Sequence, residues 1–301
     1  MRAEAIQTDQ SFELERSKRR VKRRRFLSQL LTYIVLTVLG VFFLFPFFVM
    51  ICLSILSNAE VNQQILFTRT GVIYLGAYKS ILSAGSNYLR YMANTLIVSV
   101  ICAVGIPFVS SLCAYGFSKL EFKGRDVMFA IVLGTMMIPS VISIVPLYTI
   151  YARLGWLDTL YPLFVPSLFG GGAVNIFLMR QFMLGIPNDL LKSAKLDGAN
   201  SFVIFIRLVI PLCIPIFLYV SVISFFNAWG DFMGPYTYIT IGSEWTTLAL
   251  GVYWDYGPAS SSTYANSAMA AGVVMMLPCI ILFLIFQNSL IEGVSLTGIK
   301  G

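Results

Sequence analysis

Residues 190–216, LLKSAKLDGANSFVIFIRLVIPLCIPI, change from a charged segment with small residues into an apolar run. The first part holds two lysines, an aspartate and a glycine, whereas the second carries Pro211 and Pro215 one helical turn apart. Proline bends a helix because it lacks an N–H group and its ring clashes with the preceding turn. We therefore predict a polar loop that leads, through a kink, into a membrane-spanning helix.

The polar part of this stretch predicts two short helices joined by a tight turn. Residues 187–189, Pro-Asn-Asp, are typical of a helix start, because an acceptor side chain and acidic charge favour the positive end of the helix dipole. Gly198 is expected to end the first helix in a left-handed conformation. Asn200 or Ser201 can then cap a second helix that begins near Phe202.

The rest of the chain is far more apolar than a soluble domain. Hydrophobic residues make up 57% of the 301 residues and charged residues only 12%. The charged residues cluster between long uncharged stretches, and about 20 apolar residues cross a bilayer as a helix. Six stretches qualify: Phe26–Leu56, Tyr91–Ser118, Val127–Ala152, Thr159–Met179, Leu208–Gly230 and Ala259–Ile291. The sequence therefore predicts an all-α, polytopic transmembrane helix bundle, because a transmembrane β-barrel would need short segments of alternating polarity.

The basic residues predict how these spans are oriented. If residues 1–25 lie inside, seventeen of the 21 lysines and arginines fall on the inner side. By the positive-inside rule, both termini are then cytoplasmic. We divide the chain into a basic cytoplasmic arm, residues 1–25, and a six-span transmembrane domain, residues 26–301. The first apolar run is too long for a signal peptide and lacks a small-residue cleavage site, so we expect a retained span.

Composition also excludes several function classes. The net charge of +7 follows from this topology, and no folded soluble face is available for reading nucleic acid. The basic run 16–25 suits contact with anionic membrane lipid. Histidine is absent, which removes the commonest general base and metal ligand. The five cysteines all lie in predicted spans without paired spacing, so neither a disulfide framework nor a metal site is expected.

Polar side chains in or at the ends of the spans are candidates for contact with a solute. They are Asn175, Asn227, Trp229 and Asp231. Polar groups at such positions cost free energy, so they are expected mainly where they serve a function. Asp231 could equally be a structural residue. A triple glycine close to Asn175 favours a helix that lines a path, although transmembrane helices are rich in glycine and proline in any case. The aromatic residues of segment 231–258 suit either an interfacial belt or stacking on sugar rings.

The opening stretch also resembles the EAA loop of ABC importer permeases, in which a Glu-Ala-Ala triplet precedes a glycine and a proline-terminated apolar pattern. The residues at the matching positions are Lys192, Ser193 and Ala194, then Asp197, Gly198 and Ala199, then Leu208, Ile210 and Pro211. Lysine and serine replace the first two residues of the triplet, which weakens any salt bridge made by the family glutamate. MMIPSVISIVPLYTIYARLGWLDT, FLMRQFMLGIPNDLL, FFNAWGDFMGPY and FQNSLIEGVSLTGIKG are similar to the maltose and multiple-sugar branch of these permeases.

The resemblance implies a type I ABC importer permease for a carbohydrate, with an oligosaccharide favoured. It implies a bacterial inner-membrane location and, as partners, a second related permease, two cytoplasmic ATPase subunits and an extracytoplasmic solute-binding protein. Residues 184–211 would be the loop that couples the chain to the ATPases. The chain has no G-x-x-x-x-G-K-[ST] phosphate loop, so we expect ATP and Mg²⁺ on those subunits, with no cofactor and no enzymatic activity in this chain.

Two alternatives remain open at this point. One is an ABC permease for another solute, such as an amino acid, phosphate or a metal. The FFNAWGDF stretch and the GIKG ending argue against this alternative. The other is a membrane-embedded transferase, which would need acidic or histidine clusters near a membrane face.

Overall fold

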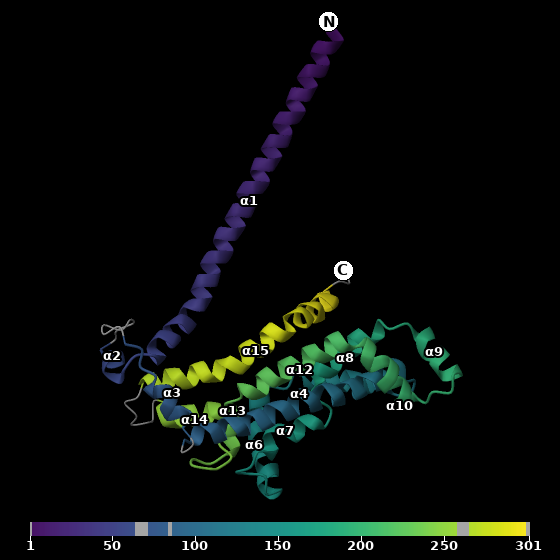
Figure 1. Ribbon diagram of the computed structural model, residues 1–301. Helices are drawn as coiled ribbons and strands as arrows, with labels where there is room; N and C mark the ends of the chain where they lie inside the picture. Colours follow the sequence, from purple (N-terminus) through teal and green to yellow (C-terminus); the bar gives the residue numbers. More distant parts are fainter. Residues whose placement is uncertain (1, 64–71, 84–85, 258–264, 299–301) are drawn as a thin grey trace.

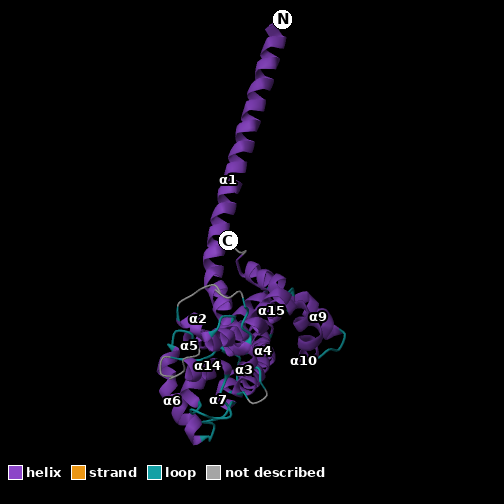
Figure 2. Cartoon of the chain, turned by 60° about the vertical axis from the view of Figure 1, so that its left-hand side comes forward, coloured by secondary structure: helices purple, strands orange, loops and turns teal. Residues whose placement is uncertain are grey.

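The computed structural model describes residues 2–63, 72–83, 86–257 and 265–298. Helices dominate these ranges, and no strand occurs within them (Figure 2). In chain order the elements are α1 (Arg2–Ser54), α2 (Asn58–Asn62), α3 (Gly76–Ile81), α4 (Asn87–Lys119), α5 (Arg125–Thr135), α6 (Ser140–Arg153), α7 (Tyr161–Phe164), η1 (Pro166–Leu168), α8 (Ala173–Leu184), α9 (Asn188–Leu196), α10 (Ser201–Ile204), η2 (Phe205–Val209), α11 (Ile210–Leu212), α12 (Ile214–Trp229), α13 (Met233–Tyr238), α14 (Leu248–Tyr256) and α15 (Ala265–Gly298). The all-α prediction is confirmed.

The helices supply the six predicted spans. Four segments are long and apolar enough to cross a membrane: Arg25–Ser54, Asn87–Lys119, Tyr161–Leu184 and Ala265–Leu290. Two bent pairs pass the same test together, α5 with α6 and the segment Ser201–Leu212 with α12. Counting each pair as one span gives six, in the order that the sequence predicts.

Proline explains both bends. α5 and α6 meet at 97°. Pro139 cannot donate to the Thr135 carbonyl and its ring would clash there, so α5 ends at Thr135 and α6 follows Pro139. The second pair meets at 82° around Cys213, between Pro211 and Pro215. The kink predicted for the fifth span is therefore confirmed.

α4 is the central helix, and it packs against α8 and α12. Pro107 lies inside α4, where it leaves the Ala103 carbonyl without its helical partner. The Ser221 hydroxyl of α12 donates to this carbonyl at 2.8 Å. The bond satisfies a freed backbone group inside the span and joins the two helices.

The loops gather at two ends of the bundle (Figure 1). α9 and α10 lie at one end, called here the α9 end, whereas α2, α3 and α14 lie at the other, called the α14 end. α15 runs from the α14 end toward the α9 end. The polar loop predicted from residues 190–216 therefore lies at the opposite end of the bundle from α14.

α1 leaves the α14 end as one long helix and extends away from the bundle (Figure 1). The predicted arm, residues 1–25, continues into the first span without a break from Arg2 onward. No glycine or proline occurs before Gly40, so no helix-breaking residue separates the arm from the first span. α1 contacts α15, and just after its end the Asn266 amide of α15 donates to the Leu56 carbonyl at 3.0 Å.

The buried side chains form separate apolar clusters along the bundle. One lies under the α9 end and includes Met183, Phe205 and Val209, which are all completely buried. Another, at the α14 end, includes Trp229 and Leu248. Both clusters contain residues of α4 and of the fifth span, so these two elements connect the ends of the molecule.

Candidate coupling loop and translocation path

The first predicted helix of the loop is α9, and its end is fixed by a Schellman motif. Gly198 has a φ of +85°, and its N–H donates to the Lys195 carbonyl at 3.0 Å. The N–H of Ala199 donates to the Ala194 carbonyl, also at 3.0 Å. Glycine fits this left-handed position because it has no Cβ. The predicted turn is confirmed.

The second helix begins with a capped turn and then widens. The Asn200 side chain accepts a hydrogen bond from the N–H of Val203 at 2.9 Å, at the start of α10. A π-helical turn, η2, follows before α11. Pro211 cannot donate to the Arg207 carbonyl, so a wider backbone pattern precedes it. The cap was predicted and the π turn was not.

The predicted coupling residues fall into two sets. The half-buried residues, which pack against the apolar cluster under the α9 end, are Ala194, Ala199, Leu208 and Ile210. The exposed residues are Lys192, Ser193, Asp197, Gly198 and Pro211. The first set fixes the loop to the bundle, and the second set is accessible to another protein.

α9 also carries apolar side chains on both sides. Leu191 points into the bundle and is 6% exposed, whereas Leu196 is 89% exposed. Leu190 and, on α10, Phe202 are exposed as well. Several large apolar side chains on one short polar loop are typical of a contact surface.

Lys192, which is predicted to occupy the position of the family glutamate, lies 3.0 Å from the Asp189 carboxylate. Both side chains are largely exposed, and surface ion pairs of this kind contribute about 0–1 kcal/mol. The pair therefore does little to hold α9 in place, and Lys192 remains accessible.

The anchor of α9 is Lys119, a residue that the sequence analysis did not single out. Its ammonium group donates to the Ile186 carbonyl at 2.6 Å and to the Asn188 side-chain oxygen at 3.0 Å. These contacts join the last residue of α4 to the first residue of α9. The only sequence signal was a cation at the end of a span.

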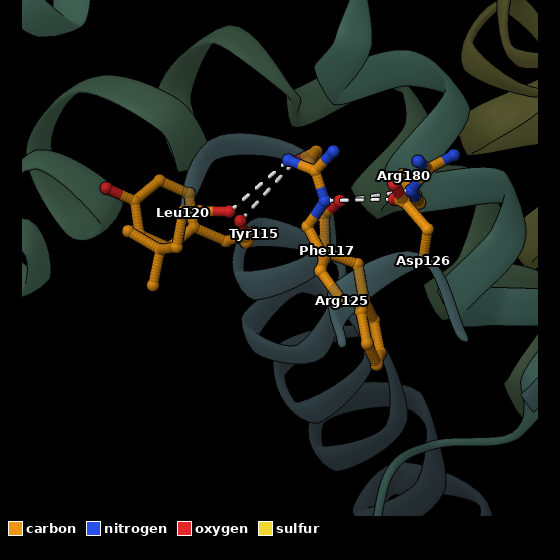
Figure 3. A network of polar contacts seen from close by, with 7 residues as sticks. Tyr115, Phe117, Leu120, Arg125, Asp126 and Arg180 are labelled. Atoms are coloured by element: carbon orange, nitrogen blue, oxygen red, sulfur yellow. Dashed lines mark hydrogen bonds and ion pairs between the residues drawn. The ribbon is translucent and has the colours of Figure 1, made fainter. Parts of the chain in front are cut away.

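Two arginines support the same end of α4 (Figure 3). Arg180 donates to the Phe117 carbonyl at 3.2 Å, and Arg125 donates to the Leu120 carbonyl at 3.4 Å. Arg125 also pairs with Asp126 at 3.1 Å. Cations near the carbonyl end of a helix are favoured by its dipole. The α9 end of α4 is therefore held by cations from α5 and α8.

Residues 170–172 break the fourth span between η1 and α8. All three glycines have positive φ, at 101°, 71° and 89°. A Cβ on Gly171 would overlap the Ser110 hydroxyl and lie 2.7 Å from the Ile106 carbonyl, so only glycine fits. The amide of Asn175, a predicted path residue, donates to the Gly171 carbonyl at 2.7 Å.

The other three path candidates lie close together at the end of α12. Trp229 is buried and donates from Nε1 to the Met275 carbonyl at 2.8 Å. Asp231 accepts from the N–H of Gly234 at 3.1 Å, and burial raises the pKa of its carboxyl. Asn227 is exposed. In this conformation Asn227 is the most accessible of the three, whereas Trp229 is part of the core.

The segment between α13 and α14, residues 239–247, is held by α4. The buried Asn94 amide donates to the carbonyls of Glu244 and Thr246, at 2.8 and 3.0 Å. Hydrogen bonds made away from water are costly to leave unmade. Sequence reasoning missed this contact, which joins residues 150 and 152 positions apart.

Thr95 and Asp158 fix the two ends of the same segment. The N–H of Leu248 donates to the Thr95 hydroxyl at 2.8 Å. At the other end, the Asp158 carboxylate accepts from the N–H and the hydroxyl of Thr240, at 3.1 and 2.9 Å. Asp158 has a φ of 58°, and elsewhere in the described chain positive φ occurs only at glycine.

The Asp158 carboxyl has a lowered pKa. Partial burial on its own would raise the pKa. Hydrogen bonds from Ser243 and from Thr240 together lower it by more than burial raises it. Ile241, at the tip of the segment, is 82% exposed. The 239–247 segment is thus firmly attached and still presents an apolar side chain outward.

Aromatic and small apolar residues line a hollow of about 350 Å³ at the α14 end. Its lining includes Phe232, Tyr253 and Tyr256. The rings of Phe232 and Tyr253 meet edge to face, with their centroids 4.9 Å apart. These contacts fit a packed interfacial belt as well as a sugar-stacking surface, so both interpretations of the aromatic segment stay predictions.

A six-span helix bundle with a broken interior span and a folded polar loop at one end is the architecture expected of a membrane transport subunit. The match to known families is specific: residues 105–295 fit the model of the binding-protein-dependent transport system inner membrane component. The chain belongs to this family. It is therefore a multi-pass membrane permease and not an enzyme.

Sequence similarity to individual relatives extends over most of the chain. The arabinooligosaccharides transport system permease protein AraQ of Bacillus subtilis (strain 168) is 31% identical over 268 residues, which cover 87% of this chain and 92% of AraQ. The galactooligosaccharides transport system permease protein GanQ of the same organism is 26% identical over 287 residues, covering 93% and 99%.

The fold is similar to that of a solved importer. A chain of the bacterial alginate ABC transporter, crystallised in complex with its alginate pentasaccharide-bound periplasmic protein, superposes with a TM-score of 0.61. The match covers 86% of this chain and 93% of that chain at 17% sequence identity. The likeness confirms the predicted type I permease fold.

Proposed function

We propose that this chain is the permease subunit of a carbohydrate importer that is driven by two cytoplasmic ATPase subunits docked on residues 184–211. The substrate is an oligosaccharide, and a second related permease completes the path. The observation that carries the proposal is the α9 loop, which is fixed to the bundle on one side and exposes Lys192, Ser193 and Leu196 on the other.

The names of the relatives support the sugar assignment, since AraQ and GanQ are both named for oligosaccharide transport. Two of the four path candidates, Asn175 and Asn227, offer amides without a charge, which suits an uncharged solute. The four path candidates remain proposals for the site where the sugar passes.

The positive-inside rule supports placing the α9 end in the cytoplasm. The α14 end then faces outward, where a solute-binding protein docks. Leu196 and Ile241, at opposite ends of the bundle, would meet the ATPase subunits and the binding protein respectively.

Energy enters the chain through contact. ATP binding closes the ATPase subunits, α9 moves with them, and the bent fifth span transmits the movement to the path. Changing a two-state equilibrium from 1:99 to 99:1 takes about 5.5 kcal/mol of differential binding. The ATPase subunits must therefore bind the loop tightly. ATP and Mg²⁺ stay on the ATPase subunits.

Reconstitution tests the proposal. The chain, its partner permease and the ATPase subunits are placed in liposomes with ATP inside and binding protein outside. We expect uptake of radiolabelled arabino- or galacto-oligosaccharide that requires both ATP and binding protein. Uptake of an amino acid or phosphate in place of any sugar would contradict the substrate class. ATP hydrolysis by the purified chain alone would contradict its role as permease.

A further inference from the structure

Lys119 joins α4 to α9 and to the connection that precedes α9. Its ammonium group contacts the Ile186 carbonyl, after the end of α8, and the Asn188 side chain, at the start of α9. Hydrogen bonds from a charged donor are stronger than neutral ones. When α9 moves, it must therefore either break these bonds or move α4 with it.

The opposite end of the same helix holds the 239–247 segment. Asn94 binds two of its carbonyl groups, and Thr95 accepts from the first N–H of α14. Asn94 and Lys119 are 25 positions apart in one helix. At 1.5 Å per residue, this separation is about 38 Å.

The helix between these contacts is kept continuous despite Pro107. The Ser221 hydroxyl supplies the hydrogen bond that proline removes from the Ala103 carbonyl. Without it, the freed carbonyl would favour a hinge at this point. α4 is therefore one continuous helix, with polar side-chain contacts to the 239–247 segment near one end and to α9 at the other.

We propose that Lys119 is a positioning residue that ties the coupling helix α9 to α4, and that α4 carries the state of α9 to the 239–247 segment. This inference rests on the proposed function. It adds a second route to the bent fifth span, one that connects the two sites where partners dock. Because linkage is reciprocal, binding protein at the 239–247 segment also changes the affinity of the ATPases for α9.

The test uses the reconstituted complex. Its readouts are the factor by which sugar-loaded binding protein stimulates ATP hydrolysis and the sugar imported per ATP. Lys119→Met keeps the stem and removes the charge. We expect it to lower the stimulation factor by at least about fivefold, the lower end of typical coupling between linked sites. Lys119→Arg should restore most of it, and Lys123→Met, in the exposed turn that follows α4, should resemble wild type.

A second pair of variants keeps the test decisive if Lys119→Met fails to assemble. Asn188→Ala removes one acceptor and leaves the Ile186 carbonyl, so a smaller loss of stimulation is expected. Asn94→Ala should also lower stimulation, whereas Asn87→Ala, at the exposed start of α4, should not. The double variant Asn94→Ala/Asn188→Ala should lose less than the two single losses combined, because both interrupt one route.

Unchanged stimulation and unchanged sugar per ATP in Lys119→Met, or in Asn188→Ala where the former does not assemble, would overturn the inference. So would independent losses in the double variant. A wild-type complex that imports no sugar with ATP would instead refute the proposed function.

Discussion

Gly198→Val tests whether the α9 loop couples the chain to its ATPases. Gly198 has a φ of +85°, and a Cβ placed there would meet nothing within 4 Å. The expected destabilisation is therefore backbone strain alone, about 1–2 kcal/mol for an L-residue in the left-handed region. Strain of this size changes the ratio of native to distorted loop by a factor of about 5–30.

Gly155→Val is the matched control. Gly155 ends α6, has a φ of +68°, and also has open space around its Cβ position. Its N–H donates to the Ala152 carbonyl, and the N–H of Trp156 donates to the Tyr151 carbonyl, so the motif is the same as at Gly198. The two variants thus share their strain and differ in their location.

Three measurements are made on each variant: its level in the membrane, the ATPase subunits that co-purify with it, and ATP-driven uptake of sugar. Both should reach the membrane at similar levels. Gly198→Val should lose ATPase subunits and uptake, whereas Gly155→Val should retain both. Wild-type uptake by Gly198→Val, or equal loss of ATPase subunits in the two variants, would refute the coupling role of the loop.

Three further predictions follow from the described geometry. Gly171→Ala should lower the folded yield of the protein sharply because its Cβ overlaps the Ser110 hydroxyl, whereas Gly170→Ala, with open space around it, should show only backbone strain of about 1–2 kcal/mol. Since the pKa of Asp158 is lowered by folding, its bonds stabilise the protein above the unfolded pKa of about 3.9 and are lost as the pH falls through the lower folded value; Asp158→Asn should reduce this acid-dependent change in thermal stability. In intact cells, a cysteine replacing Ile241 should react with an impermeant thiol reagent and one replacing Ser193 should not, and the reverse pattern would overturn the orientation.

Features with local causes could be predicted from the sequence. Apolar length predicts the spans, Gly198 and Asn200 predict the turn and the cap, and the paired prolines predict the kink at Cys213. Each of these depends on backbone chemistry within a few residues.

Features that depend on distant partners could not be predicted. The contact of Lys119 with Asn188 and that of Asn94 with Thr246 join residues 69 and 152 positions apart. A single sequence carries no signal that pairs such residues. The surroundings of Trp229 also depend on a distant residue. It was a path candidate because of its place at the end of a span, but its indole group is buried in the core and donates to the Met275 carbonyl.

The most direct test of the account is site-specific photo-crosslinking in membranes of cells that contain the complete importer. A photoreactive side chain replaces Leu196, which is 89% exposed on α9, or Glu244, which is exposed at the opposite end of the bundle. Mass spectrometry identifies the captured chain. If the ATPase subunits dock on α9, Leu196 should capture a subunit with a G-x-x-x-x-G-K-[ST] phosphate loop and Glu244 should not. Capture of that subunit from Glu244, or its absence from the Leu196 adducts, would show that the ATPase subunits do not dock on α9.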